Sequence, residues 1–294
     1  VLEEDQSVIL RAQGDDTLND RDGLIIDWNL SDVLDNLTVS TDGSTSDVAT
    51  SWPTSGEHII SVRAVDDNGA TSSTSLAKVT IVNVPPTMTA EANFLNAVNN
   101  GLTVSEDDKV VFDVIVDDTA SDKDSLEVCW DIDGTRDADL DGTLNNDCDV
   151  SGTHFEYTWE TSNPQFRTVT AWVKDDDGAM ASISAVVKVQ NVLPGAEISF
   201  ANGSLDNLVK GDTLNLTSDG TTDSDSDKLN MLYVWKFEWR GESDLGESGP
   251  TVSITDLPVG TWDINLTVTD DDLASSTKTI TIIVSEPPPE GFLE

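Results

Sequence analysis

The sequence has few basic residues, few histidines and few cysteines. Its 294 residues include 15 lysines and arginines against 56 aspartates and glutamates, a formal net charge of -41 at pH 7. Proteins that bind nucleic acid need a basic surface against the phosphates, so this balance argues against a nucleic-acid partner. The two histidines and two cysteines do not stand at the fixed short spacings of a zinc site, which would need further Cys or His residues near them. No apolar run reaches about 18 residues, so the sequence predicts no membrane span.

What the sequence does contain is one pattern repeated three times. An alternating strand runs into an acidic turn in "HIISVRAVDDNGA" (58–70), "RTVTAWVKDDDGA" (167–179) and "WDINLTVTDDDLA" (262–274). Upstream of each lies a strand centred on tryptophan, in "LIIDWNL", "LEVCWDI" and "YVWKFEW". Another acidic turn precedes each tryptophan strand, and one more strand and a proline follow each aspartate turn. A repeat of this length predicts tandem domains rather than solenoid units.

The repeats predict three domains, at 1–85, 86–194 and 195–288, followed by a tail at 289–294. Strand patterns without a helical period indicate an all-β class, with one β-sandwich in each copy and no helix longer than about two turns. Prolines at the seams "NVPP" and "NVLP" favour short, stiff connections between the copies.

Three stretches carry a family resemblance: "GTWDINLTVTDDD" (260–272), "YVWKF" (233–237) and "DRDG" (20–23). On these, each copy resembles the polycystic-kidney-disease (PKD) type of immunoglobulin-like domain. The family's "F-G-D-G" after the tryptophan is absent from all three copies. The seam "NVPP" is also similar to the seam of cadherin-like repeats. The resemblance implies immunoglobulin-like sandwiches that can hold calcium near the junction with the preceding domain.

Calcium takes six to eight oxygen ligands, which clustered aspartates and asparagines supply. Carried over by position, the expected ligands come from the two acidic turns of each copy and from the preceding seam. They are Asp20, Asp22 and Asp66 in the first copy, Asp122, Asp124, Asp175 and Asn83 in the second, and Asp225, Asp227, Asp270 and Asn191 in the third. The register of the third set is open, because Leu229 stands where the other copies have their second turn aspartate. The alternative is that these are solvated aspartates that close turns.

The second copy carries an acidic insertion at 131–149, "DIDGTRDADLDGTLNNDCD". Its "DADLDG" matches the first half of an EF-hand loop. Without flanking helices, however, it resembles the calcium loops of thrombospondin type 3 repeats more closely. The predicted calcium ligands of this loop are Asp131, Asp133, Asp137, Asp139, Asp141, Thr143, Asn145, Asp147 and Asp149. A loop of solvated charges is the alternative.

The two cysteines, Cys129 and Cys148, flank this insertion. Trp130 is expected on the core face of its strand, so Cys129 points to the other face, and a disulfide across the core is not expected. A Cys129–Cys148 bond is predicted instead, at the base of the loop. In the chain-entropy model such a bond contributes roughly 3 kcal/mol.

A non-catalytic, calcium-stabilised structural or adhesive spacer of a secreted or cell-surface protein is the predicted function. A module that binds proteins or glycans is the main alternative, for which Trp52, Trp172 and Trp239 are expected to be exposed. Sequons for N-glycosylation occur at Asn29, Asn36, Asn202, Asn215 and Asn265.

Paired carboxylates would also suit a glycoside hydrolase. The carboxylates recur with the copies, however, whereas a catalytic centre is normally unique, and no nucleophile-elbow, zincin or P-loop motif is present.

Overall fold

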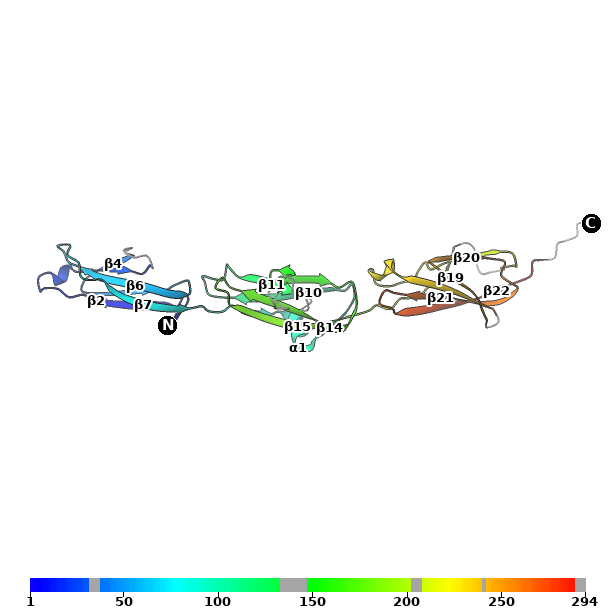
Figure 1. The fold of residues 1–294 in the computed structure, drawn as a ribbon, viewed down its shortest axis with the longest axis horizontal. Helices are drawn as coiled ribbons and strands as arrows, with labels where there is room; N and C mark the ends of the chain where they lie inside the picture. The colour runs from blue at the N-terminus through cyan, green and yellow to red at the C-terminus, as the bar shows by residue number, and fades with distance from the viewer. Residues whose placement is uncertain (32–37, 133–146, 202–207, 240–241, 289–294) are drawn as a thin grey trace, which may run out of the picture. The chain divides into compact units, whose positions relative to one another are not determined.

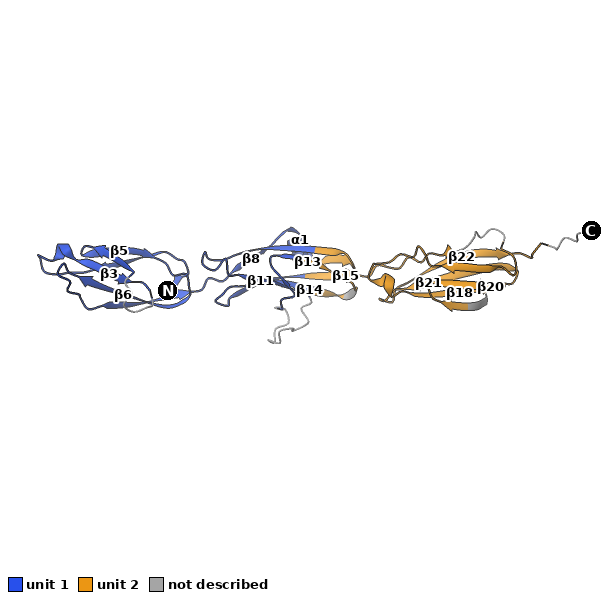
Figure 2. Cartoon of the chain, turned by 90° about the horizontal axis from the view of Figure 1, so that it is seen from above, with its two compact units in different colours: residues 1–100, 111–155, 168–185 blue, residues 101–110, 156–167, 186–294 orange. Residues whose placement is uncertain are grey.

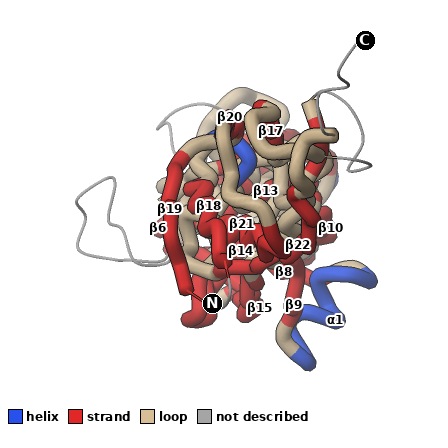
Figure 3. Tube along the Cα trace, turned by 90° about the vertical axis from the view of Figure 1, so that its right-hand side faces the viewer, coloured by secondary structure: helices blue, strands red, loops and turns tan. Residues whose placement is uncertain are grey.

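The computed structural model describes residues 1–31, 38–132, 147–201, 208–239 and 242–288 (Figure 1). Within this part of the chain strand predominates, as the red segments of Figure 3 show. The strands form six sheets, which follow one another along the chain as three pairs, each with one larger and one smaller sheet. The predicted all-β, immunoglobulin-like class is therefore confirmed.

The first sheet pair consists of a five-stranded sheet in the order β1-β7-β6-β3-β4 and a two-stranded sheet, β2-β5. The bounds are β1 Leu2–Glu3, β2 Val8–Gln13, β3 Ile25–Asn29, β4 Val39–Asp42, β5 Thr45–Thr50, β6 Gly56–Val65 and β7 Ser75–Val82, with a 3-10 helix, η1, at Arg21–Gly23. Trp28 and Ile26 of β3 pack with Val48 of β5, so that apolar side chains join the two sheets. A second cluster forms around Trp52.

The second sheet pair consists of a three-stranded sheet, β13-β10-β8, and a five-stranded sheet, β12-β11-β14-β15-β9. The bounds are β8 Thr87–Ala90, α1 Ala92–Asn100, β9 Leu102–Ser105, β10 Lys109–Asp117, β11 Glu127–Asp131, β12 Val150–Ser151, β13 His154–Thr158, β14 Asn163–Lys174 and β15 Met180–Gln190. Trp130 is fully buried among Phe94, Phe112 and Phe155, with the rings of Phe94 and Trp130 4.9 Å apart. These rings form an aromatic core between the two sheets.

Helix α1 was not predicted, and the expectation of no helix beyond two turns is wrong at this point. Its nine residues place Phe94 and Ala97 on one buried face, three positions apart, and both are fully buried. The helix ends at Gly101, whose φ of 71° is the left-handed conformation that commonly follows a helix. Only one turn of apolar spacing stands in a polar segment, which is too little for a periodicity signal.

The third sheet pair consists of sheets β16-β17-β20 and β19-β18-β21-β22. The bounds are β16 Ser199–Phe200, β17 Thr213–Thr217, β18 Leu232–Trp239, β19 Glu242–Ser248, β20 Thr251–Thr255, β21 Gly260–Thr269 and β22 Ser275–Val284, with a 3-10 helix, η2, at Asp227–Leu229. Trp235, Phe237 and Ile264 of the larger sheet pack in one cluster with Leu216 and Val252 of the smaller one. The tryptophan of the repeated strand is thus a core residue in all three pairs.

The chain divides into two compact units (Figure 2), the first of residues 1–100, 111–155 and 168–185 and the second of residues 101–110, 156–167 and 186–294. The division into three domains at 85, 194 and 288 stays a prediction. Among the described residues no helix has the length and apolar character needed to cross a membrane.

Cys129 and Cys148 form a disulfide, as predicted, with their Cα atoms 5.1 Å apart. Cys129 is opposite Trp172 on the neighbouring strand, and both side chains are buried. The indole of Trp172 donates a hydrogen bond to the carbonyl of Asp147, 3.2 Å away. The end of the insertion therefore covers the outer face of the sheet at this point. The expectation that Trp172 and Trp52 are exposed is wrong, since both are more than nine-tenths buried, and Trp239 is half-buried.

Candidate metal centres

The short strands β1 and β9 are each followed by a turn, and the two turns have the same backbone conformation. Each strand pairs in parallel with the last strand of its own sheet pair. The amide of Glu4 donates to the carbonyl of Val82 at 3.2 Å, and that of Glu106 donates to Gln190 at 2.9 Å. The aspartate that follows each glutamate has a positive φ, 55° at Asp5 and 62° at Asp107. Aspartate tolerates this left-handed conformation better than most residues do.

The turns carry Glu4 and Glu106 into the interior, where their exposed fractions are 3% and 2%. One carboxylate oxygen of each accepts a hydrogen bond from a seam amide, Val84 to Glu4 at 3.2 Å and Val192 to Glu106 at 2.6 Å. The other oxygen of each is buried and has no hydrogen-bond partner within the part of the chain that the structure describes. A buried carboxylate oxygen without a partner costs free energy, so each is an open ligand position.

A second pair of carboxylates comes from the turn before each tryptophan strand. In this turn the motif D-[ST]-x-x-D begins at Asp118 and Asp223 and ends at Asp122 and Asp227. The first aspartate accepts from the amide that follows it, at 2.7 Å in the Asp118 turn and 2.9 Å in the Asp223 turn. The last aspartate is buried, with exposed fractions of 4% for Asp122 and 0% for Asp227.

The turn after the long central strand supplies Asp175 and Asp270, both buried. One oxygen of each closes the turn by accepting from the amide four residues on, at 2.7 Å in both. The other oxygen accepts from the seam asparagine, Asn83 for Asp175 and Asn191 for Asp270, at 2.9 Å in both. This contact turns the asparagine's own carbonyl oxygen inward, where it is buried without a partner.

These side chains form two clusters with the same composition. The first seam site consists of Glu4, Asn83, Asp118, Asp122, Asp175 and Asp177. The second seam site consists of Glu106, Asn191, Asp223, Asp227, Asp270 and Asp272. At the second site two triads of carboxylates, each within 4.8 Å, share Asp227, whereas no such triad lies at the first site among the described residues. That sharing provides two adjacent positions for a cation.

The crowding of like charges raises several pKa values. Burial raises the pKa of Glu4 to about 7, and the carboxyl of Asp177 beside it adds to the rise. Burial raises the pKa of Glu106 to about 7 as well, with contributions from Asp227 and Asp272. Burial and the adjoining Asp271 raise the pKa of Asp227 to about 6. A cation at each site would reverse these shifts, because it favours the ionised form.

Both sites offer oxygen ligands alone, from carboxylates and an amide carbonyl. Hard cations such as calcium prefer this chemistry, and an irregular set of six or more oxygens suits calcium better than the strict octahedron of magnesium. The unpartnered oxygens at the two sites belong to Glu4, Asn83, Asp118, Glu106, Asn191, Asp223 and Asp227. The residues therefore fit a divalent cation.

The structure brings some of the predicted ligands together and leaves others apart. It gathers Asn83, Asp122 and Asp175 at the first seam site, and Asn191, Asp227 and Asp270 at the second. Asp124 and Asp225 are exposed, and Asp225 pairs with Lys228 at 2.8 Å.

In the first copy, Asp22 is exposed, Asp20 accepts from the hydroxyl of Thr17 at 2.7 Å, and Asp66 closes its own turn. No triad of carboxylates near these three is found among the described residues.

Much of the acidic insertion lies outside the described residues, including Asp133, Asp137, Asp139, Asp141, Thr143 and Asn145. Of its predicted ligands that the structure describes, Asp131 and Asp147 are buried. Asp149 accepts from the amide of Ile132 at 3.0 Å, which closes the base of the loop. Calcium binding by this loop stays a prediction.

Sequence reasoning missed the two glutamates, together with Asp118, Asp177, Asp223 and Asp272. The motif D-[ST]-x-x-D, which recurs at Asp16, Asp118 and Asp223, was the available signal. It also settles the open register, because Asp122 and Asp227 both stand eight residues before their tryptophan. Asp227 is therefore equivalent to Asp122. No residue of the first seam site is equivalent to Asp225.

No family model and no curated protein matches the chain. Among solved structures, Sidekick-1 immunoglobulin domains 1-5 align over 98% of this chain with 12% identity and a TM-score of 0.40, and the chain spans 57% of that structure's length. Three N-terminal domains of the bacteriophage RB49 outer capsid protein Hoc align over 98% of this chain and 96% of their own, at 14% identity and a TM-score of 0.31. The PKD1 domain of Vibrio anguillarum Epp aligns over 33% of this chain and 100% of its own, at 23% identity and a TM-score of 0.24.

Proposed function

We propose that this chain is a non-catalytic structural or adhesive module of a secreted or cell-surface protein, and that calcium at the two seam sites holds its sheet pairs together. The observation that carries the proposal is the recurrence of the same residue types at both seams, with buried carboxylate oxygens that have no partner among the described residues. Solvated turn aspartates would not need to be buried, nor to face one another.

Two further observations support an extracellular setting. The disulfide Cys129–Cys148 is of the kind that persists in oxidising compartments. The net charge of -41 is reduced when divalent cations bind, and extracellular fluids supply calcium at concentrations that suit weak sites. A glycan-binding role is less favoured, because Trp52 and Trp172 are buried and offer no stacking surface.

Calorimetric titration of the full chain with calcium tests the proposal. The variant Asp122→Asn removes a buried carboxylate of the first seam site, and Asp124→Asn is its matched control, with the same chemical change two residues away on an exposed side chain. Asp122→Asn should weaken one class of calcium site at least tenfold, and Asp124→Asn should leave it unchanged.

The same titration can reject the proposal. Calcium bound only by the folded chain raises its free energy of unfolding by about 2.7 kcal/mol at a hundredfold excess over Kd. A chain that takes up no calcium at millimolar concentration, and whose melting temperature ignores EGTA, is not stabilised in this way. Equal effects of Asp122→Asn and Asp124→Asn would place the calcium elsewhere.

A further inference from the structure

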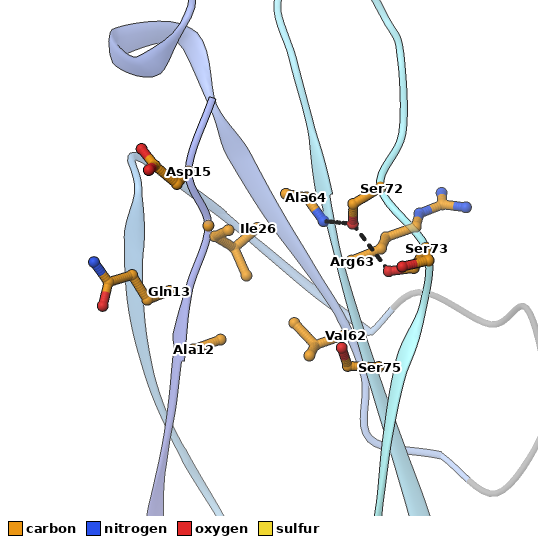
Figure 4. A pocket seen from close by; sticks show the side chains of 11 residues that line it. Ala12, Gln13, Asp15, Ile26, Val62, Arg63, Ala64, Ser72, Ser73 and Ser75 are labelled. Atoms are coloured by element: carbon orange, nitrogen blue, oxygen red, sulfur yellow. Dashed lines mark hydrogen bonds between the residues drawn. The ribbon is translucent and has the colours of Figure 1, made fainter. Parts of the chain in front are cut away.

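The cavity in the first sheet pair and the second seam site differ in what they can bind. The cavity measures about 260 Å³ and has Gln13 on one side and Ser72 on the other, as Figure 4 shows. Its lining includes a single carboxylate, that of Asp15, which forms an ion pair with Arg21. Such a lining has little charge with which to attract a divalent cation. Additional cations are therefore expected at the second seam site rather than in this cavity.

The two triads of the second seam site bring five carboxylates together. The Glu106 triad consists of Glu106, Asp227 and Asp272, and the Asp223 triad consists of Asp223, Asp227 and Asp270. The ligand oxygens of each triad lie within 4.8 Å of one another, so the ionised groups repel one another unless a cation lies between them. One divalent ion leaves three of the five negative charges uncompensated, whereas two ions leave one. Charge balance therefore favours two ions.

Both triads have buried oxygens that accept no hydrogen bond from the described residues. In the Glu106 triad these oxygens belong to Glu106 and Asp227, which are 2% and 0% exposed. In the Asp223 triad one belongs to Asp223. Beside this triad the amide of Asn191 donates to Asp270 at 2.9 Å, and the carbonyl oxygen of Asn191 is buried in the same unsatisfied state. Since a buried oxygen without a partner costs free energy, each triad offers an open ligand position of its own.

The shared residue, Asp227, is fixed in place by the residue before it. The amide of Ser226 donates to the carboxylate of Asp107 at 2.8 Å, and the hydroxyl of Ser226 is 3.1 Å from the same oxygen. Asp107 directly follows Glu106, so these contacts tie the turn that carries Glu106 to the turn that carries Asp227. The hydroxyl of Ser226 is also 3.2 Å from one oxygen of Asp227, while the other oxygen of Asp227 is the open one.

The first seam site has the same residue types in a looser arrangement. Ser121 stands in the place of Ser226, and its amide donates to Asp5 at 2.9 Å. Its hydroxyl pairs with that of Thr119 at 3.1 Å, and in the described part of the chain it makes no second contact with Asp5. Asp122, the equivalent of Asp227, belongs to no triad of carboxylates among the described residues. One ion is therefore expected at the first seam site.

We propose that the second seam site binds two calcium ions at once, with Asp227 as a ligand of both, and that the first seam site binds one, an inference that rests on the proposed function. Glu106 and Asp272 are ligands of one ion at the second seam site. Asp223 and Asp270, together with the carbonyl oxygen of Asn191, are ligands of the other. Water and backbone carbonyls supply the remaining ligands, as is usual for calcium.

Counting the calcium bound per chain tests the proposal. The full chain is dialysed at the lowest free calcium concentration that fills the sites of the unsubstituted chain, and bound calcium is measured by atomic emission. Asp227→Asn should remove two ions per chain, because both ions lose a ligand. Glu106→Gln and Asp223→Asn should each remove one.

Two further variants are the controls for this count. Asp225→Asn makes the same chemical change as Asp227→Asn on an exposed side chain two residues away and should remove no ion. Asp122→Asn changes the equivalent residue of the first seam site and should remove one ion.

Energy transfer between lanthanide ions gives a second measurement that does not require Asp227→Asn to fold. Terbium and europium take the same oxygen ligands as calcium, and energy passes from terbium to europium only when the two ions are close together. The unsubstituted chain loaded with both metals should show europium emission on excitation of terbium. Glu106→Gln should reduce this emission, and Asp225→Asn should leave it unchanged.

The outcomes separate this inference from the function on which it rests. If Asp227→Asn removes a single ion, as Asp122→Asn does, or if Glu106→Gln keeps the full europium emission, the second seam site does not bind two ions, and the proposed function still stands. If the unsubstituted chain takes up no calcium at all, the proposed function fails and this inference fails with it.

Discussion

The second seam site and the corresponding turn of the third sheet pair share a backbone and differ in charge. The amide of Lys210 donates to Ser285 at 2.9 Å, just as Glu106 donates to Gln190. Asp212 closes the Lys210 turn by accepting from Val209 at 2.9 Å, as Asp108 does from Ser105 at 3.1 Å. Yet the third turn has an exposed lysine where the second has a buried glutamate, and Glu286 stands where the second has Asn191.

The difference teaches that this turn does not need a carboxylate in order to fold. Lysine and glycine, at Lys210 and Gly211, form it as well as glutamate and aspartate do. Gly211 has a φ of 98°, so it takes the left-handed position at no steric cost. A glutamate buried among other carboxylates at the equivalent position lowers the stability of the fold unless something positive binds there.

The largest effect on calcium binding and melting temperature is expected when Glu106 of the second seam site is replaced by lysine, the residue found in the third turn. Glu106→Lys places an ammonium group among Asp223, Asp227 and Asp272 in place of a ligand. Calcium binding at this site should be lost, and the melting temperature without calcium should rise, because a like charge has been replaced by an opposite one.

Melting curves with calcium and with EGTA measure both effects of Glu106→Lys. Glu247→Lys makes the same change of charge on an exposed strand residue and is the control. If Glu106→Lys keeps the full calcium-dependent rise in melting temperature, the second seam site is not a calcium site.

A smaller effect is expected from pH in the calcium-free chain. Glu4 and Glu106 have pKa values of about 7 in the fold, against an ordinary value of 4.5. Since the folded state holds protons that the unfolded chain has released, this contribution to stability is fully present below the ordinary value and is lost as pH rises through about 7.

Urea unfolding in EDTA at about pH 6 and about pH 8 measures this loss. The free energy of unfolding should be higher at the lower pH. Calcium should reverse the trend, because it binds the deprotonated carboxylates and competes with protons. An unchanged free energy of unfolding between the two pH values would mean that the fold does not raise the pKa values of Glu4 and Glu106.

The smallest effect is expected from the opposite exchange, Lys210→Glu. The third turn would then carry the glutamate of the seam sites but would still have Glu286 in place of the asparagine. Calcium stoichiometry should stay the same, and stability should change by no more than about 0.5 kcal/mol, as for an ordinary surface substitution. An additional calcium ion in the titration of this variant would show that one glutamate is enough to make a site.

Local patterns predicted the strands of the fold well, because alternation and turn chemistry are properties of short segments. Strands centred on Trp28, Trp130 and Trp235 were predicted from the repeat, and all three tryptophans are buried. Alternation does not tell what covers the second face of a sheet, which is why the burial of Trp172 by the end of the insertion was missed.

The residues of the two candidate sites could be predicted only where they belong to short segments that the repeat aligns. Asp122 and Asp175 belong to turns that the repeat aligns, so they could be named. Glu4 lies more than a hundred residues from Asp122 in the sequence, and only the fold shows that they meet. In the third copy both Asp225 and Asp227 were named, and only Asp227 is buried, because spacing within an acidic turn does not reveal which carboxylate points inward.

In each sheet pair a short segment before the central strands pairs in parallel with the last strand, and this pairing has a mechanical consequence. When the two ends of a sheet pair are pulled apart, strands paired in parallel slide past each other, so their hydrogen bonds are loaded together rather than one after another. The second pair has four residue partners in this arrangement, Leu102–Ser105 against Val187–Gln190, the first has two, and the third has the single bridge between Val209 and Ser285. Under tension the third pair should therefore yield first and the second pair last.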